Sequence, residues 1–175
     1  MWSSEVTNMI ITGIWETLYM TLVSTLVGYV IGLPMGIILT VSDKDGIKPN
    51  AVLYKILDVI ANIVRSVPFI ILLVLLIPFT RLVVGKSYGS TATIVPLVIA
   101  AAPYIARMVE SSLKEVDAGV IEAARSMGAS NFTIITKVML VEARTSLLVG
   151  ATITLGTILG LSLIHISEPT RPLYI

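Results

Sequence analysis

The chain has 175 residues, of which 55% are hydrophobic and only 13% are charged, with a formal net charge of +1. A soluble domain carries about 25% charged residues, so this composition excludes an ordinary soluble enzyme and a disordered chain, and predicts a membrane protein in contact with lipid. The near-zero net charge argues against a nucleic-acid partner, and the absence of cysteine excludes disulfides, thiolate metal sites and cysteine nucleophiles.

Uncharged apolar stretches predict four membrane-spanning helices, at about residues 16–41, 59–83, 90–110 and 144–160. A bilayer core needs about 20 apolar residues, and the uncharged runs 17–41, 87–106 and 145–164 are long enough. The second span has a shorter uncharged run, 66–80, which the apolar residues 59–64 extend. The fold class is therefore all-α, a polytopic transmembrane helical bundle.

Positively charged residues are concentrated in two segments of the chain. Segments 42–65 and 107–144 hold nine cations, whereas 1–16 and 81–89 together hold two. Because cytoplasmic loops carry the excess of Lys and Arg, we expect the first two segments in the cytoplasm and the N-terminus outside. No Lys or Arg precedes Lys44, so we expect no cleavable signal peptide.

Small residues and prolines mark the predicted spans. Gly28, Gly32 and Gly36 lie four residues apart and therefore share one face of the first helix. Such rows allow two helix backbones to approach closely in lipid. Packing within one subunit is the favoured interpretation, and a subunit interface is the alternative. Prolines within or at the ends of spans predict bent helices; they are Pro34, Pro68, Pro78, Pro96 and Pro103.

Charged residues after the third span predict that its helix continues past the membrane. Arg107 and Glu110 are three residues apart, and Glu110 and Lys114 are four apart, so both pairs share a helix face. We expect a solvated extension there. Asp117 can then cap a short helix that runs from Ala118 to Met127.

A helix, a glycine and a second helix are predicted over residues 118–140, a segment that we call the elbow. Gly128 can take the left-handed position that ends the first arm, and Ser130 can cap the second. The first arm has an apolar stripe of Val120, Ile121, Ala124 and Met127, and the second carries Phe132, Ile135, Val138 and Met139 on one side. Such short helices are not stable alone in water. Their apolar side must pack on the membrane domain or on a cytoplasmic partner, and the spacing leaves both open.

The run 122–128 (EAARSMG) resembles the EAA-xxx-G signature of ABC importer permeases and stands between two spans, as in that family. One departure is Val141, where proline is usual, so we expect a less sharply bent start to the last helix. Further matching runs are 15–17, 32–34, 65–70, 77–81 and 102–107. Over residues from about 10 to 160 the chain resembles the permease subunits of methionine-type ABC importers.

This resemblance implies a homodimer in the bacterial cytoplasmic (inner) membrane, with a cytoplasmic ATP-binding subunit and an extracytoplasmic substrate-binding lipoprotein as partners. ATP hydrolysis is then expected in the separate subunit, so this chain should hold no catalytic residue and no cofactor. The elbow is expected to contact the ATPase. The coupling residues that the resemblance implies are Val120, Ile121, Glu122, Ala123, Ala124, Met127 and Gly128.

Two features of the sequence resemble parts of nucleotide-binding and metal-binding sites. The run 85–87 (GKS) resembles the end of a phosphate-binding P-loop, but Thr80 stands where that motif needs its first glycine. The only histidine, His165, has no second metal ligand near it in the sequence. We therefore expect neither a nucleotide site nor a metal site.

The last residues do not resemble the permeases. We interpret 1–160 as the ABC transporter type-1 transmembrane domain, incomplete at its C-terminus, and 161–175 as a non-native tail that resembles a translated sequencing adaptor. Four of the five spans of an intact family member are then present. Apolar tail residues would complete the last span and leave Glu168 and Pro169 beyond it. The small residues Gly150, Gly156 and Gly160 should lack a partner.

Three alternatives remain. A permease for another small amino acid would look much the same, since the substrate rests on resemblance only. An ion-coupled secondary transporter usually has ionisable residues at mid-membrane, which the three clearest spans lack. A purely structural membrane protein would not need the apolar-striped elbow.

Overall fold

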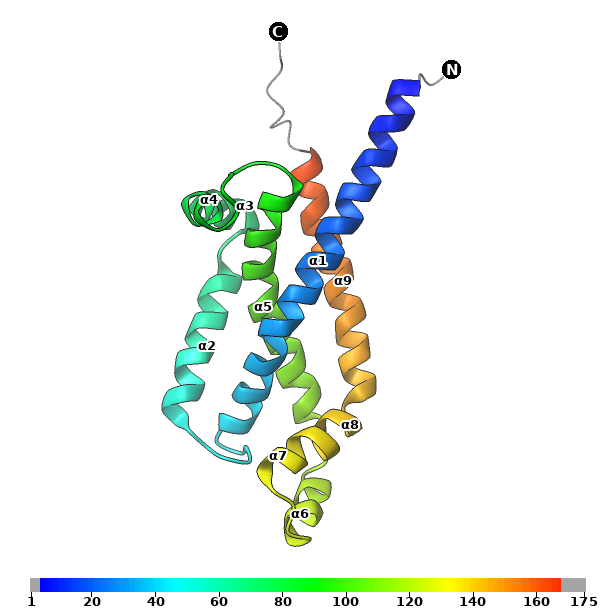
Figure 1. The fold of residues 1–175 in the computed structure, drawn as a ribbon. Helices are drawn as coiled ribbons and strands as arrows, with labels where there is room; N and C mark the ends of the chain where they lie inside the picture. The colour runs from blue at the N-terminus through cyan, green and yellow to red at the C-terminus, as the bar shows by residue number, and fades with distance from the viewer. Residues whose placement is uncertain (1–3, 168–175) are drawn as a thin grey trace.

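The computed structural model describes residues 4–167, and every regular element in that part of the chain is helical (Figure 1). Three helices are long and apolar enough to cross a membrane: α1 (Ser4–Ser42), α5 (Ser90–Lys114) and α9 (Arg144–Ser167). A bent pair of shorter helices would make a fourth span. The prediction of an all-α membrane bundle is confirmed.

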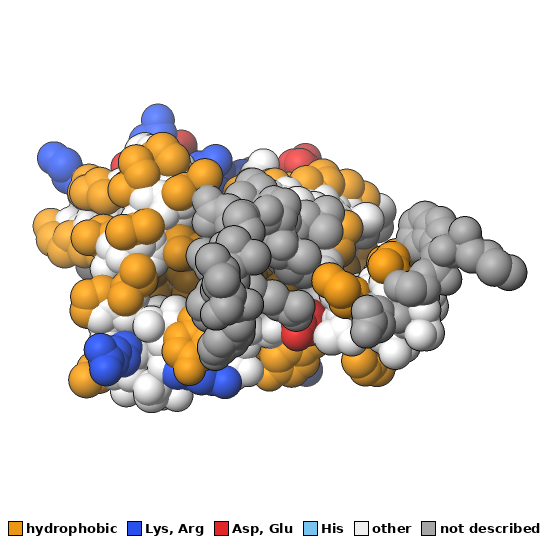
Figure 2. All heavy atoms as spheres, turned by 90° about the horizontal axis from the view of Figure 1, so that it is seen from above, with side chains coloured by type: hydrophobic (Ala, Val, Ile, Leu, Met, Phe, Trp, Pro, Cys, Tyr) orange, Lys and Arg blue, Asp and Glu red, His pale blue; other side chains and the backbone are white. Residues whose placement is uncertain are grey.

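The outer surface of the bundle is apolar, as lipid requires. Large hydrophobic side chains are exposed along the spans, among them Leu22, Leu26 and Val30 on α1 and Leu148 on α9. Seen from above, hydrophobic side chains cover much of the visible surface, and the charged ones are few (Figure 2). Contiguous apolar surface on this scale is not tolerated on a soluble monomer.

Helix α1 begins earlier than the sequence analysis predicted, at Ser4 and not near residue 16. Glu16 ended the uncharged run, but a single carboxylate does not interrupt a helix whose backbone hydrogen bonds are all local. The preceding apolar residues, such as Ile11 and Ile14, extend it and have exposed side chains. These first turns project beyond the neighbouring helices (Figure 1).

The predicted single helix over 59–83 is wrong. This region contains three helices: α2 (Ala51–Ser66), α3 (Phe69–Leu75) and α4 (Ile77–Val84). The first two meet at 103°. Pro68 disfavours the helical conformation of the residue before it, and Val67 accordingly has extended backbone, with φ −80° and ψ 124°. The uncharged run 66–80 is short because the predicted span is divided into separate helices at Val67.

Helix α5 begins at Ser90, where the third span was predicted, and extends to Lys114. The predicted ion pairs of Arg107 with Glu110 and of Glu110 with Lys114 both form. The expectation that this extension is solvated is wrong, since Glu110 is buried. The extension lies beside the end of α1 and beside α2, which cover it.

Helix α9 begins at Arg144, as predicted, and continues past residue 160 to Ser167. Ser162 is buried, and its hydroxyl lies 3.3 Å from that of Thr21 on α1. Glu168 and Pro169 lie outside the described residues. Gly150 does have a neighbour, Met108, whereas Gly156 and Gly160 face open space.

The glycine row of α1 lies directly against α5. A Cβ added to Gly32 would be 2.7 Å from the carbonyl oxygen of Ala102, and one added to Gly36 would be 2.5 Å from that of Ala106. Gly28 lies more loosely against Ile105 and Ala101. The row therefore packs between two helices of the same chain, and α5, which carries more buried residues than any other helix, forms the centre of the bundle.

The segment between α5 and α9 folds back at the end of the bundle opposite the N-terminus of α1 (Figure 1). It contains α6 (Ala118–Ser126), α7 (Asn131–Thr133), the π-helical turn η1 (Ile134–Met139) and α8 (Leu140–Glu142). These elements form the elbow.

Candidate functional site

The local geometry of the elbow follows the predicted capping pattern. The Asp117 carboxylate accepts a hydrogen bond from the backbone N–H of Gly119 at 2.7 Å, and the Ser130 hydroxyl accepts one from that of Thr133 at 3.3 Å. Gly128 has φ +82°, the left-handed conformation expected where α6 ends. The two arms are thus joined by a short turn whose geometry depends on one glycine.

The apolar stripe of the first arm divides between two environments. Ala124 is buried, and Ile121 packs against the core of the chain. Val120 is 41% exposed and Met127 is 82% exposed. One side of α6 therefore packs on its own membrane domain, as the first alternative has it, and the other side is exposed. That a cytoplasmic partner covers the exposed side stays a prediction.

The second arm differs from its prediction. Phe132 is 75% exposed, whereas Ile134 and Met139 are buried, so the predicted apolar side with Phe132 in it is wrong. In a π-helix the hydrogen bonds run from i to i+5, which places residues five apart on one face. The helical period of 3.6 used for the prediction does not apply to η1, and the buried pair is five residues apart.

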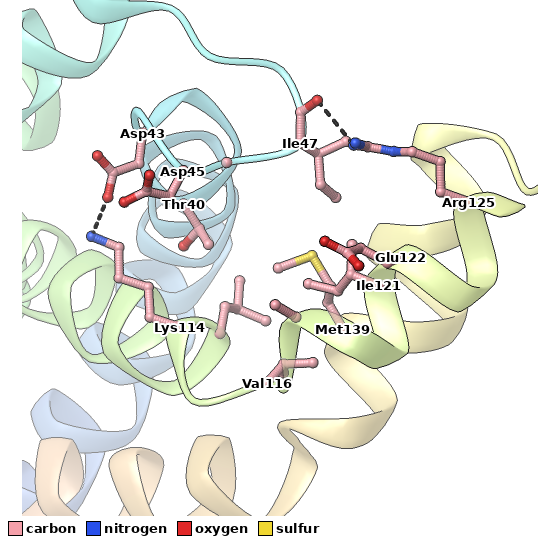
Figure 3. Close-up of a pocket in the computed structure, with 13 residues that line it drawn as sticks. Thr40, Asp43, Asp45, Ile47, Lys114, Val116, Ile121, Glu122, Arg125 and Met139 are labelled. Atoms are coloured by element: carbon pink, nitrogen blue, oxygen red, sulfur yellow. Dashed lines mark hydrogen bonds and ion pairs between the residues drawn. The ribbon is translucent and has the colours of Figure 1, made fainter.

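Glu122 and Ala123, the first residues of the EAA run, are exposed on α6. Glu122 lines a pocket of about 510 Å³ between the elbow and the loop that follows α1 (Figure 3). Within residues 4–167 its carboxylate has no ion-pair partner closer than 4 Å. It is therefore a pocket-lining carboxylate that no cation of the described residues compensates.

Arg125 connects the elbow to the rest of the chain, a role that the sequence analysis did not assign. Its Nη2 donates a hydrogen bond to the carbonyl oxygen of Ile47 at 3.3 Å, across the same pocket (Figure 3). Ile47 belongs to the loop between α1 and α2. The sequence could not predict this hydrogen bond, because the two residues are 78 positions apart and only the tertiary structure brings them together.

A charged network lies where α5 meets the elbow. The Glu110 carboxylate, 6% exposed, binds Arg107 Nη1 at 2.7 Å and Lys114 Nζ at 2.8 Å. Arg107 also pairs with Asp58 of α2, and Lys114 Nζ lies 2.6 Å from an oxygen of Asp43, just after α1. We call these five residues the charged network. The sequence predicted its three members on α5 but neither of the two aspartates.

Asp43 gives the charged network a pH dependence. The hydrogen bond from Lys114 lowers the pKa of this carboxyl below its ordinary value of 3.8. A depressed pKa contributes stability above the ordinary value, which is lost as the pH falls through the folded-state pKa. At pH 7 we expect Asp43→Asn to lower the free energy of unfolding by about 0.5–1 kcal/mol, since Lys114 is partly exposed.

Denaturant unfolding of parent and Asp43→Asn in detergent measures this difference. The two chains should converge as the pH falls below 3.8. Asp45→Asn is the matched control, because that carboxylate is exposed and lies 3.9 Å from the exposed Lys44. A difference that persists unchanged at pH 3 would show that the aspartate stabilises the fold through something other than its charge.

The described residues offer little for catalysis. Among the residues whose side chains the structure describes, 4 and 6–162, no group of three or more His, Cys, Asp or Glu could hold a metal ion. Gly85, in the P-loop-like run, has φ +79° and ends α4, so this glycine serves as a helix C-cap. That the chain works without a cofactor stays a prediction. What the elbow offers is a set of exposed apolar side chains on a segment that packs against the bundle.

Comparisons with known proteins agree on one family. The family described as "Binding-protein-dependent transport system inner membrane component" matches residues 28–166. The D-methionine transport system permease protein MetI of Salmonella typhimurium (strain LT2) is 54% identical over 154 residues, which are 88% of this chain and 71% of the relative. The MetI protein of Escherichia coli (strain K12) is also 54% identical over the same shares.

Solved structures give the same result. A chain of the MetNI methionine ABC transporter in an inward-facing conformation superposes with a TM-score of 0.91 at 52% identity, covering 93% of this chain and 76% of that one. An amino acid ABC transporter crystallised with histidines shares the fold, with a TM-score of 0.74 at 24% identity. On the family match and the 54% identity, the chain belongs to the inner-membrane components of binding-protein-dependent transport systems.

Proposed function

We propose that this permease carries methionine through the inner membrane, driven by a separate cytoplasmic ATPase that docks on the elbow. Whole-chain identity of 54% to permeases named for D-methionine transport supports the substrate. The pairing with an ATPase is supported by the similarity to the MetNI ABC transporter. A second copy of the chain and a substrate-binding lipoprotein complete the proposed assembly. The outward orientation of the N-terminus stays a prediction.

One structural observation carries the docking part of this proposal. The elbow is held against its own bundle by Ile121, Ala124 and Met139, yet it presents Met127 and Phe132 almost fully exposed. Exposed apolar side chains on a supported surface mark protein contacts. The uncompensated Glu122 carboxylate, which lines the pocket between the elbow and the loop after α1, is suited to a cation of the partner. We therefore assign Met127 and Phe132 as the apolar part of the docking surface.

Co-purification with the ATPase subunit tests the docking surface. Met127→Glu places a charge where an apolar contact is proposed, and we expect binding to weaken by at least about 2 kcal/mol, a factor of about 30. Met127→Leu keeps the apolar contact and should bind like the parent. An ATPase that binds Met127→Glu as well as the parent contradicts the assigned surface.

Uptake by membranes that hold the permease, the ATPase and the binding protein tests the substrate. Labelled methionine should accumulate only with ATP, and excess unlabelled methionine should suppress its accumulation. Competition by another small amino acid at equal excess, with no effect of methionine, would favour the alternative substrate. Uptake driven by an ion gradient without the ATPase would instead favour a secondary transporter.

A further inference from the structure

Helix α2 is weakly packed for an element at the side of the bundle. Of its 16 residues, Ala61 is buried, and no other described side chain of the helix is. Its apolar residues Val52, Ile56 and Ile60 line a shallow outer surface. Helix α2 nevertheless contacts the last turns of α5 through Tyr54 and Asp58. Apolar burial alone gives little reason for α2 to keep this position.

Polar contacts to α5 supply what apolar packing does not. Arg107 binds Asp58 of α2, and its Nη2 also donates to the Asn62 side-chain oxygen at 3.1 Å. The Tyr54 hydroxyl donates to Glu110 Oε1 at 3.2 Å. These contacts involve residues on successive turns of α2. Together they tie α2, over residues 54–62, to the last turns of α5.

Glu110 is the member that both cations of the network share. Its carboxylate stands between Arg107, which reaches α2, and Lys114, which reaches the loop after α1. A buried carboxylate is retained only when its charge is compensated, and here two cations and a hydroxyl do so. Without its charge, each cation would keep only the aspartate on its own side as an ion-pair partner, and the ionic link between the two sides would be lost.

The charged network also stands next to the elbow in the chain. Lys114 is the last residue of α5, and α6 begins at Ala118. On the α5 side of the elbow, a displacement therefore reaches Lys114 before the other members of the charged network. From there, the one ion pair to α2 among the described residues is that of Arg107 with Asp58, and Tyr54 of α2 also contacts Glu110 and Lys114 directly.

We propose that Glu110 is a positioning residue that makes α2 follow the elbow. When the elbow moves, the network carries α2 and the end of α1 along with α5, so that the three elements shift together. This inference rests on the proposed function in one respect, that the docked ATPase is what moves the elbow. It assigns a specific role to a buried acidic residue that the elbow motif does not include.

Distance measurement between two spin labels tests this link on the chain itself. The sequence has no cysteine, so Lys55→Cys on α2 and Ser126→Cys on α6 give two unique exposed labelling sites. The parent should show one narrow distance distribution. Glu110→Gln, which keeps the size of the side chain and removes its charge, should at least double the width. Glu115→Gln, an exposed carboxylate outside the network, is the matched control and should leave the width unchanged.

A second readout separates positioning from general stability. In the assembled transporter, Glu110→Gln should raise the ATP hydrolysed per methionine transported at least threefold, while Glu115→Gln should not change it. A variant that is merely less stable would lose both activities in proportion. That outcome would overturn the inference, as would an unchanged distance distribution in Glu110→Gln.

The tests remain decisive if one variant fails. Should Glu110→Gln not fold, Asp58→Asn removes the α2 side of the network and is expected to broaden the same distribution; an unchanged width there overturns the inference. Absence of methionine transport by the parent would count against the proposed function. The distance measurement requires no transport, so it still decides whether α2 follows the elbow.

Discussion

Replacing Gly36 with valine is expected to prevent the chain from folding. A Cβ at this position would lie 2.5 Å from the Ala106 carbonyl oxygen and 2.7 Å from the Val109 Cβ, and valine adds two further methyl groups. The obstacle is backbone, so no rotamer change relieves it. Overpacking typically costs about 1–3 kcal/mol, and we expect more here because two helices must separate. Such a loss is a large part of a total stability of about 5–15 kcal/mol.

The yield of monodisperse protein in mild detergent and its thermal unfolding midpoint measure this effect. Gly13→Val is the matched control: Gly13 lies in the same helix, with nothing within 4 Å of an added Cβ. It should fold like the parent, because valine costs a helix no more than glycine does. If Gly36→Val had the midpoint of Gly13→Val, α1 and α5 would not approach each other as described.

Replacing Gly128 with valine is expected to uncouple transport while the chain still inserts into the membrane. The φ of +82° is strongly disfavoured for a β-branched residue, and the strain costs about 1–3 kcal/mol. An added Cβ meets nothing within 4 Å, so the whole effect is conformational. The elbow can relieve the strain by changing the angle between its arms, which moves Met127 away from the position in which we propose that it contacts the ATPase.

Membrane insertion and ATP-driven uptake, measured side by side, test this prediction. Gly128→Asn is the informative control, because asparagine tolerates the left-handed region better than any β-branched residue and should retain most uptake. Glu122→Ala should be milder than Gly128→Val, since it removes one exposed charge and leaves the geometry intact. Uptake by Gly128→Val at the parent rate would show that the turn geometry at the elbow is unimportant for coupling.

Features with a local cause could be predicted from the sequence. The helical spans follow from apolar runs, and the caps at Asp117, Gly128 and Ser130 follow from residues only two or three positions apart. The close approach of the glycine row could also be expected, since residues four apart share a helix face. Even there, the sequence left open which helix would lie against it.

Features that depend on contacts between distant segments could not be predicted from the sequence. The break at Val67 has a local signal in Pro68, but its 103° bend depends on how α3 packs beyond it. Ile134 and Met139 are both buried although they lie five positions apart, because they belong to a π-helical turn. The apolar pattern of the sequence did not predict this turn. The pairing of Asp58 with Arg107 joins residues 49 positions apart, and the fold brings them together by laying α2 along α5.

The physical reason for this division is the range of the interactions. Apolar runs, caps and i,i+4 pairs act within one or two helical turns, so their residues are neighbours in the printed sequence. Burial of Glu110, exposure of Met127 and the contact of Arg125 with Ile47 result from which helix surfaces meet. That choice is made by close packing over the whole bundle, where a few ångströms between α1 and α5 determine which charges face lipid, water or each other.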